Sequence, residues 1–256
     1  MSDHQSQQQV QSPTQQPPQP VQQDEPHQTQ QHNITSKTGK CDYMNPVTNV
    51  LTEAFANSDP VFRWLLLDHT PGAVQEAKLH QLLTGFTRAA ALNDAVFAEA
   101  GGDFGCVAIL MPPGKRVDNP WTMLQAGLIP AMMSIGVGGF KRAVFEYSDV
   151  THAMLPQVFT KEELKKYWYI FIIGTKLDRR RQGLASALLR HAQETGRKDG
   201  APLWLEATTE SSRDLYVKHG FKVVGEIVLG EGKVERDGLP KRGGEGVTIW
   251  GMYWRP

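Results

Sequence analysis

The segment between Tyr167 and Ala192 constrains the fold of this chain more than any other. Its first part, YWYIFIIGT, is an almost unbroken aromatic and β-branched run, typical of a strand buried on both faces. Three consecutive arginines and a glycine follow, and then Leu and Ala at helical spacing. Because a helix N-terminus presents unpaired N–H groups and a partial positive charge, we expect an anionic ligand at this strand-to-helix junction.

Hydrophobic periodicity along the rest of the chain predicts alternating helices and strands. In chain order we expect helices at 47–55 and 79–90, strands at 96–100 and 106–111, a helical insert at 119–165, a strand at 167–175, a helix from Leu184 that ends at Gly196 or Gly200, a strand at 202–207, a helix at 212–219 with Gly220 left-handed after it, and strands at 221–229 and 247–254. This order predicts an α/β domain in which helices cover both faces of a mixed central sheet.

The N-terminal composition separates residues 1–37 from the rest of the chain. Gln, Pro, Ser, Thr and His dominate there, so the segment buries too little apolar surface to offset its conformational entropy, and we expect it to be disordered. Such a tail either recruits a partner or is a solvated extension, and composition favours the extension. Residues 41–256 remain as one sizeable domain.

Charge, cysteines and hydropathy exclude several classes of protein. The formal net charge is +0, which gives no argument for a nucleic-acid or membrane partner. The two cysteines, Cys41 and Cys106, make no disulfide framework and no metal-ligand spacing, and no secretory signal is visible, so we expect a cytoplasmic protein without a metal. Residues 123–140 are barely long enough to span a membrane, and a helical hairpin broken at Pro130 and at 136–139 is the favoured interpretation.

The loop after the long strand is neither a Walker loop nor a dinucleotide-binding GxGxxG. Its Arg180-x-x-Gly183-x-Ala185 resembles the [QR]-x-x-G-x-[GA] pyrophosphate loop of the GNAT superfamily of N-acetyltransferases. Further along, LWLEATTESSRDLYVKHGFKVVGEI resembles the strand, short helix, tyrosine and Gly-Phe pair of the same superfamily. The resemblance covers roughly residues 44–254, and the insert and closing sequence are most similar to the puromycin N-acetyltransferase-like and fungal-type branch.

The resemblance implies a single GNAT-type domain whose fourth and fifth strands splay apart, with the pantetheine arm of acetyl-CoA in the gap. The pantetheine amides are then expected to pair with the backbone of Ile173, Gly174 and Thr175. Arg180 shapes the loop that receives the diphosphate. The implied diphosphate ligands are the backbone amides of Arg181, Gln182, Gly183, Leu184, Ala185 and Ser186. Family members often carry Asn near Thr209, so Thr209 and Ser212 are expected to supply hydroxyl contacts in its place.

Acetyl transfer requires a proton donor for the departing thiolate and an acceptor for the amine proton. The resemblance assigns the first role to Tyr216, with a packed aromatic as the alternative. Glu206 is the candidate acceptor, although its orientation is not fixed by strand alternation and a salt bridge to an arginine is an equal alternative. Glu146, Tyr147 and His152 in the insert are candidate substrate contacts, each with a plain surface role as the alternative.

The sequence thus predicts an acetyl-CoA-dependent acyltransferase acting on the amine of a small molecule by direct transfer in a ternary complex. Two alternatives stay open: a protein or peptide N-acetyltransferase, and a catalytically silent acyl-CoA-binding module. The acceptor and the oligomeric state are not determined by the sequence.

Overall fold

A seven-stranded sheet forms the centre of the computed structural model, which describes residues 32–256 except 57 and 68–71. The strands are β1 (Ile34–Thr38), β2 (Val96–Ala100), β3 (Cys106–Met111), β4 (Trp168–Thr175), β5 (Leu203–Ala207), β6 (Lys222–Leu229) and β7 (Val247–Trp254). Their order in the sheet is β1-β2-β3-β4-β5-β7-β6. Neighbours are antiparallel except for the parallel pair β4 and β5, so the sheet is mixed, as predicted.

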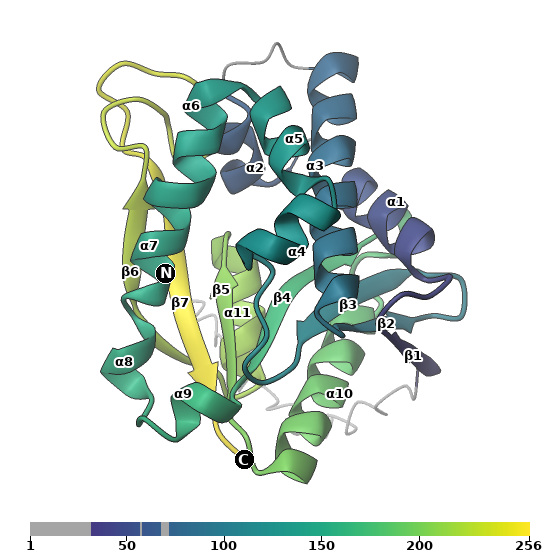
Figure 1. The fold of residues 1–256 in the computed structure, drawn as a ribbon. Coiled ribbons are helices and arrows are strands. Elements are labelled where there is room, and N and C mark those ends of the chain that lie inside the picture. The colour runs from purple at the N-terminus through teal and green to yellow at the C-terminus, as the bar shows by residue number, and fades with distance from the viewer. Residues whose placement is uncertain (1–31, 57, 68–71) are drawn as a thin grey trace, which may run out of the picture. The chain divides into compact units, whose positions relative to one another are not determined.

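Helices cover both faces of this sheet (Figure 1). Helices α1 (Met44–Phe55) and α3 (Ala73–Leu92) lie on one face, and α10 (Leu184–Asp199) lies on the other. Alternate side chains of one strand divide between the two faces: Val107 and Ile109 pack with α1 and α3, whereas Ala108 and Leu110 pack with α10. This period of two is what sorts the strand residues into two cores.

The predicted helices form because their apolar stripes are buried and their ends carry stop signals. In α1 the stripe residues Val47, Leu51 and Ala54 are buried. Helix α10 passes through Gly196 and ends at Gly200, whose φ of 57° is the left-handed conformation that closes a helix. The short helix α11 (Glu210–Lys218) precedes Gly220, which is also left-handed at φ 79° as predicted.

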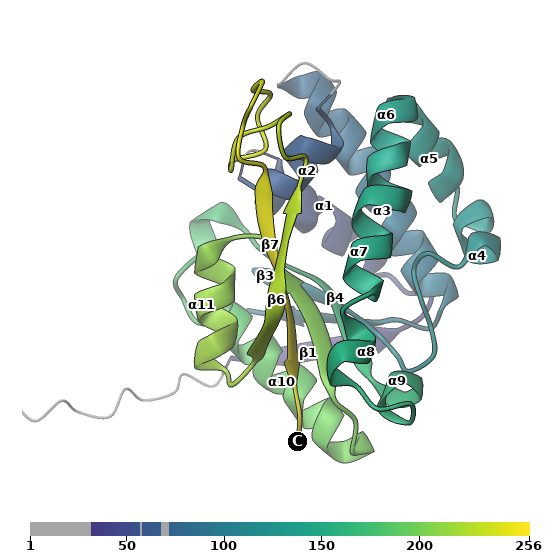
Figure 2. The same ribbon diagram turned by 90° about the vertical axis from the view of Figure 1, so that its left-hand side faces the viewer.

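The expected insert is helical but is divided differently from the prediction. It consists of α4 (Pro120–Gln125), α5 (Leu128–Ser134), α6 (Gly136–Lys141), a π-helical turn (Arg142–Tyr147), α7 (Ser148–His152), α8 (Leu155–Val158) and α9 (Glu163–Lys166). Pro130 lies in the first turn of α5, where its missing N–H costs nothing, so the break predicted there falls at Gly127 instead. The second break falls at Ile135 and Gly136, where Gly136 is left-handed at φ 85°, which agrees with the start of the predicted break at 136–139. Figure 2 shows this insert and α11 on opposite sides of β6 and β7.

One feature of the sheet, strand β1, differs from the sequence-based expectation. Residues 34–38, mostly assigned to a disordered tail, form β1, which pairs antiparallel along the whole of β2. Residues 1–31 of that tail lie outside the described residues. The last strand, β7, inserts between β5 and β6, so that the closing strands still pair with each other. Within the described chain, no helix is long and apolar enough to cross a membrane.

The centre of the sheet opens between β4 and β5, as the predicted splay requires. The two strands pair only at Trp168 with Leu203 and at Tyr169 with Trp204. On its other side β4 pairs with β3, where the register shifts and leaves Phe171 without a partner. This bulge bends the strand. It also puts both Phe171 and Ile172 on the face of α1 and α3.

Candidate active site

The opening between β4 and β5 leads into a cavity of about 1070 Å³. The cavity passes between β4 and β5 where the two strands no longer pair, so residues from both faces of the sheet line it. On the face of α1 and α3 it is lined by Phe55, Asp59, Phe62, Leu65, Phe86, Ala143, Tyr147, Phe171, Ile172 and Glu206. Toward α10 and α11 it is lined by Ile173, the loop at 179–186, Thr209, Ser212 and Tyr216.

The loop before α10 has the geometry of an anion site. Gly183 caps the helix at φ 78° without a side-chain hydrogen bond, and Arg181 is also left-handed at φ 63°. The N–H groups of the first helical turn, Leu184 to Ser186, therefore have no intrahelical acceptor and no side-chain cap. Of the predicted diphosphate ligands in 181–186, all but Gln182 line the cavity, and so does Arg180, which was predicted to shape the loop. The Leu184 side chain is buried, so its amide is the group available there.

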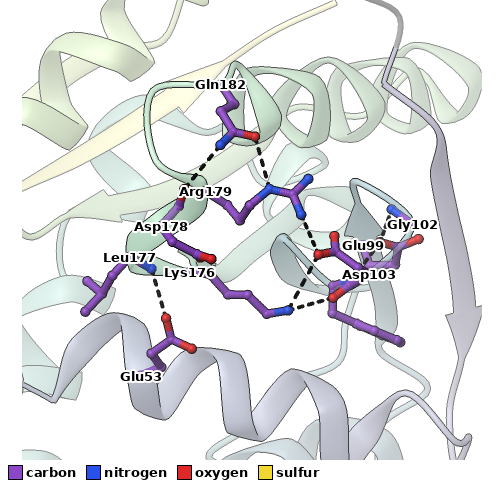
Figure 3. A network of polar contacts seen from close by, with 10 residues as sticks. Glu53, Glu99, Gly102, Asp103, Lys176, Leu177, Asp178, Arg179 and Gln182 are labelled. Atoms are coloured by element: carbon purple, nitrogen blue, oxygen red, sulfur yellow. Dashed lines mark hydrogen bonds and ion pairs between the residues drawn. The ribbon is translucent and has the colours of Figure 1, made fainter.

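A polar network fixes this loop to two neighbouring elements (Figure 3). The Arg179 guanidinium donates to the Asp103 carboxylate in the turn between β2 and β3, and Lys176 Nζ donates to the Asp103 carbonyl at 2.7 Å. Gln182 accepts from Arg179 Nε at 3.0 Å, which explains why its side chain is turned away from the cavity. Arg180 donates to the Ala54 carbonyl at 3.0 Å and so ties the loop to the end of α1.

The edge of β4 supplies the backbone that the resemblance assigned to pantetheine. Ile173, Gly174 and Thr175 all line the cavity beyond the last pairing with β5. A Cβ atom on Gly174 would lie 2.8 Å from Leu51 Cδ2 of α1, so glycine is what allows the helix to pack closely here. Helix α1 thus packs against β4 and supports the strand edge that lines the cavity.

Thr209 and Ser212 line the cavity and also cap α11. Thr209 Oγ1 accepts from the Ser212 N–H, and Ser212 Oγ accepts from the Thr209 N–H, each at 3.2 Å. This reciprocal pair is a capping box. The capping box thus fixes both hydroxyls at the start of α11, where they line the cavity next to the loop before α10.

Tyr216 lies in the cavity wall on the α10 side. Its ring packs with Phe221, with centroids 6.0 Å apart, and belongs to the core under the sheet. Burial raises the pKa of its phenol well above the usual range, and the charges of Cys106, Asp59 and Glu206 raise it further. The group therefore stays protonated at neutral pH, as a proton donor must.

Glu206 lies on the opposite side of the opening from Tyr216. Contrary to our expectation, alternation along β5 is strict: Leu205 points to the α10 core, while Trp204 and Glu206 point to the insert. Neither carboxylate oxygen pairs with an arginine in the described chain; Tyr169 Oη and Trp204 Nε1 each donate to it at 2.7 Å. Burial raises the pKa of Glu206, although these two donors lower it.

Sequence reasoning missed a second acid in the cavity, Asp59. It is 4% exposed and precedes α2 (Pro60–Leu65), whose N–H groups of Val61 and Phe62 donate to its Oδ1. Thr208 donates to its Oδ2 at 2.6 Å. An Asp directly before Pro is the signature of a helix N-cap, and that signal was available in the sequence.

The three candidates from the insert separate in the structure. Tyr147 lines the cavity, whereas Glu146 and His152 are not among its lining residues. His152 Nδ1 lies 2.9 Å from an Arg116 nitrogen, and burial together with this cation lowers the pKa of the imidazole. His152 thus joins the insert to the loop after β3. The described residues hold no group of His, Cys, Asp or Glu side chains that could bind a metal.

Comparison with known proteins agrees with this architecture. Residues 147–221, from the end of the insert through the loop to Phe221, match the model of the acetyltransferase (GNAT) family. An uncharacterized N-acetyltransferase of Schizosaccharomyces pombe is 26% identical over 179 residues, 70% of each chain.

Two solved structures show the same fold at low sequence identity. The first is described as histone acetyltransferase HPA2 and related acetyltransferase, from Corynebacterium glutamicum. Its TM-score is 0.54 at 23% identity, with 87% of this chain and 96% of that chain covered. For arylalkylamine N-acetyltransferase 2 from Aedes aegypti the TM-score is 0.55 at 18% identity, with 87% and 99% covered. The fold, the site and the matched segment together define an acyltransferase with a GNAT-like domain.

Proposed function

We propose that this chain transfers the acetyl group of acetyl-CoA to the amine of a small molecule, by direct attack within a ternary complex. The observation that carries the proposal is the opening between β4 and β5, which joins the loop before α10 on one side to the buried Asp59 and the half-buried Glu206 on the other. GNAT enzymes use acetyl-CoA as co-substrate, and the structures similar to this one include an arylalkylamine acetyltransferase. The fungal relative is compatible with the fungal-type branch, and the puromycin N-acetyltransferase-like resemblance stays part of the proposal.

The loop suits the diphosphate of the co-substrate. Gly183 has no side chain, and among the described residues a Cβ there would meet only the His32 ring within 4 Å, which leaves the amides of the first turn of α10 accessible from this side. Phosphate oxygens accept hydrogen bonds from such amides and are stabilised by the helix dipole. The edge of β4 from Ile173 to Thr175 then offers hydrogen-bonding groups to the pantetheine amides.

Each side of the opening carries out one of the two proton transfers: Glu206 accepts a proton and Tyr216 donates one. Glu206 accepts a proton from the acceptor's ammonium group, which frees the nitrogen lone pair to attack the thioester carbon. A backbone N–H of β4 near Ile173 polarises the thioester carbonyl. When the C–S bond breaks, Tyr216 donates its phenolic proton to the departing thiolate. The attacking nitrogen, which carries a positive charge after attack, gives up its second proton to restore the Tyr216 phenol, and the products are the N-acetyl amide and CoA with its thiol.

A direct assay tests this function and separates it from the alternatives. Purified protein is incubated with acetyl-CoA and a panel of small amines and peptides, and CoA release and acetylated product are both measured. We expect product from small amines. Acetylation of peptides alone would favour the protein acetyltransferase, and tight acetyl-CoA binding without any product would favour the silent module.

Gly183→Glu provides the negative control, because it places bulk and negative charge where the diphosphate is proposed to bind. At φ 78° any side chain is strained, so Gly183→Ala is the matched variant that carries the strain without the charge. We expect the Glu variant to lose acetyl-CoA binding and the Ala variant to retain most of it. Equal affinities for wild type and the Glu variant would contradict the proposed diphosphate site.

A further inference from the structure

Asp59 is the buried acid of the cavity to which the reaction scheme above gives no role. It lies before α2 on the face of the sheet that carries the insert, and it lines the cavity together with Glu206 and Tyr147. Burial raises the pKa of Tyr147 well above its usual range, and the carboxylates of Glu206 and Asp59 raise it further. Both carboxylates therefore lie within electrostatic range of the Tyr147 hydroxyl.

The fold does not need the charge of Asp59. As an N-cap it accepts from two N–H groups through Oδ1, and Asn or Ser would cap a helix equally well. A buried carboxylate without a cation nearby costs free energy. The positive charge of Arg63 lowers the pKa of the Asp59 carboxyl, but it is the weakest contribution to that pKa. The Arg63 guanidinium lies 3.7 Å from Asp237 in a separate ion pair.

The wall around Asp59 is aromatic. Phe55 and Phe62 line the cavity with ring centroids 5.4 Å apart, and Tyr147 adds a third ring. Aromatic faces attract a cation, and a desolvated ammonium gains more from them than a hydrated one. A carboxylate among aromatic rings is therefore a site for an organic ammonium group.

Among the described residues that line the cavity, Asp59 and Glu206 are the acids on this face, and the wall beyond them is apolar. It is formed by Phe86, Phe171 and Ile172, and the first two rings meet edge to face at 5.5 Å. The other described acids that line the cavity, Glu210 and Asp214, are exposed on α11 on the opposite side of the sheet. A second positive charge on an acceptor would thus be buried against apolar rings without a partner, which is costly.

We propose that Asp59 binds the ammonium group of the acceptor, and that the acceptor is a monoamine whose remaining body is aromatic or aliphatic rather than a diamine or polyamine. The inference rests on the proposed function and names the substrate class of the same site. Glu206 then removes the proton from an ammonium group that Asp59 already holds, so Asp59 determines acceptor affinity more than the rate of transfer.

A matched set of ligands tests the substrate class on the wild-type protein. Hexylamine and 1,5-diaminopentane have the same number of heavy atoms but one and two positive charges. 1-Hexanol keeps the apolar body without any charge. With acetyl-CoA saturating, we expect kcat/KM for hexylamine to exceed that for 1,5-diaminopentane by about tenfold or more. Equal values, or a preference for the diamine, would overturn the monoamine assignment.

Asp59→Asn tests the residue, because the amide retains the helix cap and removes only the charge. Binding of hexylamine and 1-hexanol to the protein saturated with CoA is measured by calorimetry. We expect the variant to bind hexylamine about tenfold or more weakly, with 1-hexanol and acetyl-CoA affinities unchanged. Thr208→Val is the matched control, since it removes a donor to the same carboxylate but leaves the charge, and it should retain amine binding.

The outcomes separate the inference from the function on which it rests. If wild type binds hexylamine through Asp59 but forms no N-acetyl product, the transferase function fails and the binding site stands. If Asp59→Asn binds and acetylates hexylamine as well as wild type does, the inference fails and the function stands. If the variant does not fold, the wild-type protein still tests the inference. Equal affinity of the wild type for hexylamine and 1-hexanol would refute an anionic binding site for the ammonium group.

Discussion

At the residue scale, the proposed chemistry depends on two half-buried groups in opposite walls of one opening. Tyr216 belongs to the core beneath α10, and Glu206 points toward the insert with Trp204. Desolvation raises the pKa of both, which keeps the phenol protonated and makes the carboxylate a stronger base. A proton donor on the co-substrate side and a proton acceptor on the amine side is the division that direct transfer requires.

Replacing Tyr216 by Phe tests the donor. The variant keeps the ring that packs on Phe221, so stability should change by no more than about 1 kcal/mol. Turnover should fall by roughly tenfold to a thousandfold, with acetyl-CoA affinity nearly unaltered. A CoA analogue with a more acidic thiol should reduce the loss, because that leaving group needs less help. Turnover at the parent rate, with chemistry rate-limiting, would show that Tyr216 only packs.

Replacing Glu206 by Gln tests the raised pKa of this carboxyl through stability. The folded protein holds the Glu206 proton more tightly than the unfolded chain does, so wild type loses stability as the pH rises above ~4 and through the raised pKa. Gln cannot ionise, and its amide can still bond Trp204 and Tyr169. The melting temperature of the variant relative to wild type should therefore increase from about pH 4 to about pH 8. A difference in melting temperature between Glu206→Gln and wild type that does not change with pH would refute the desolvated carboxyl.

At the element scale, the bulge in β4 and the close approach of α1 shape the cavity. The bulge sends Phe171 and Ile172 to the same face, so an apolar wall replaces ordinary alternation. Beyond the bulge, Gly174 lies against Leu51, Ala54 and Phe55 of α1. The strand edge therefore stays in place although β5 no longer pairs with it.

Gly174→Ala should destabilise the domain, because the added Cβ would lie 2.8 Å from Leu51 Cδ2 and Leu51 is fully buried. Overpacking of this kind costs about 1–3 kcal/mol, which a urea titration would measure. The cost should be smaller in a Leu51→Ala background, since the clashing atom is gone and the two changes are coupled. Strictly additive losses would mean that the contact with Leu51 does not limit the packing.

The elements that sequence reasoning predicted are those whose periodicity is a local property. The stripe of α1, the hairpin strands β2 and β3, and the loop before α10 all follow from residue spacing. Strand β1 was missed because its polar side chains face solvent and its pairing with β2 is a tertiary contact. Asp59 was missed because its approach to Thr208 joins residues far apart in the sequence. The resemblance, rather than periodicity, supplied the opening between β4 and β5.

At the scale of the whole molecule, the folded unit begins earlier than composition indicates. Strand β1 contributes more than its backbone pairing: Thr35 Oγ1 donates to Glu99 Oε1 at 2.7 Å, and Glu99 is 3% exposed. Glu99 also accepts from the N–H groups of Gly102 and Phe104 in the turn that carries Asp103. Through Asp103, this edge of the sheet is linked to the loop before α10.

Two truncations locate the boundary of the folded unit. Removal of residues 2–31 should leave the melting temperature unaltered, because its Gln- and Pro-rich composition predicts no buried contacts. Removal of residues 2–38 also deletes β1, takes the Thr35 donor from a buried carboxylate and exposes the edge of β2, so the melting temperature should fall by roughly 5 °C or more. Thr35→Val, which keeps the strand and removes only the hydroxyl, should lie between the two. Equal melting temperatures for both truncations would show that β1 adds nothing to stability, whereas a large loss on removing 2–31 alone would show that the tail packs on the domain.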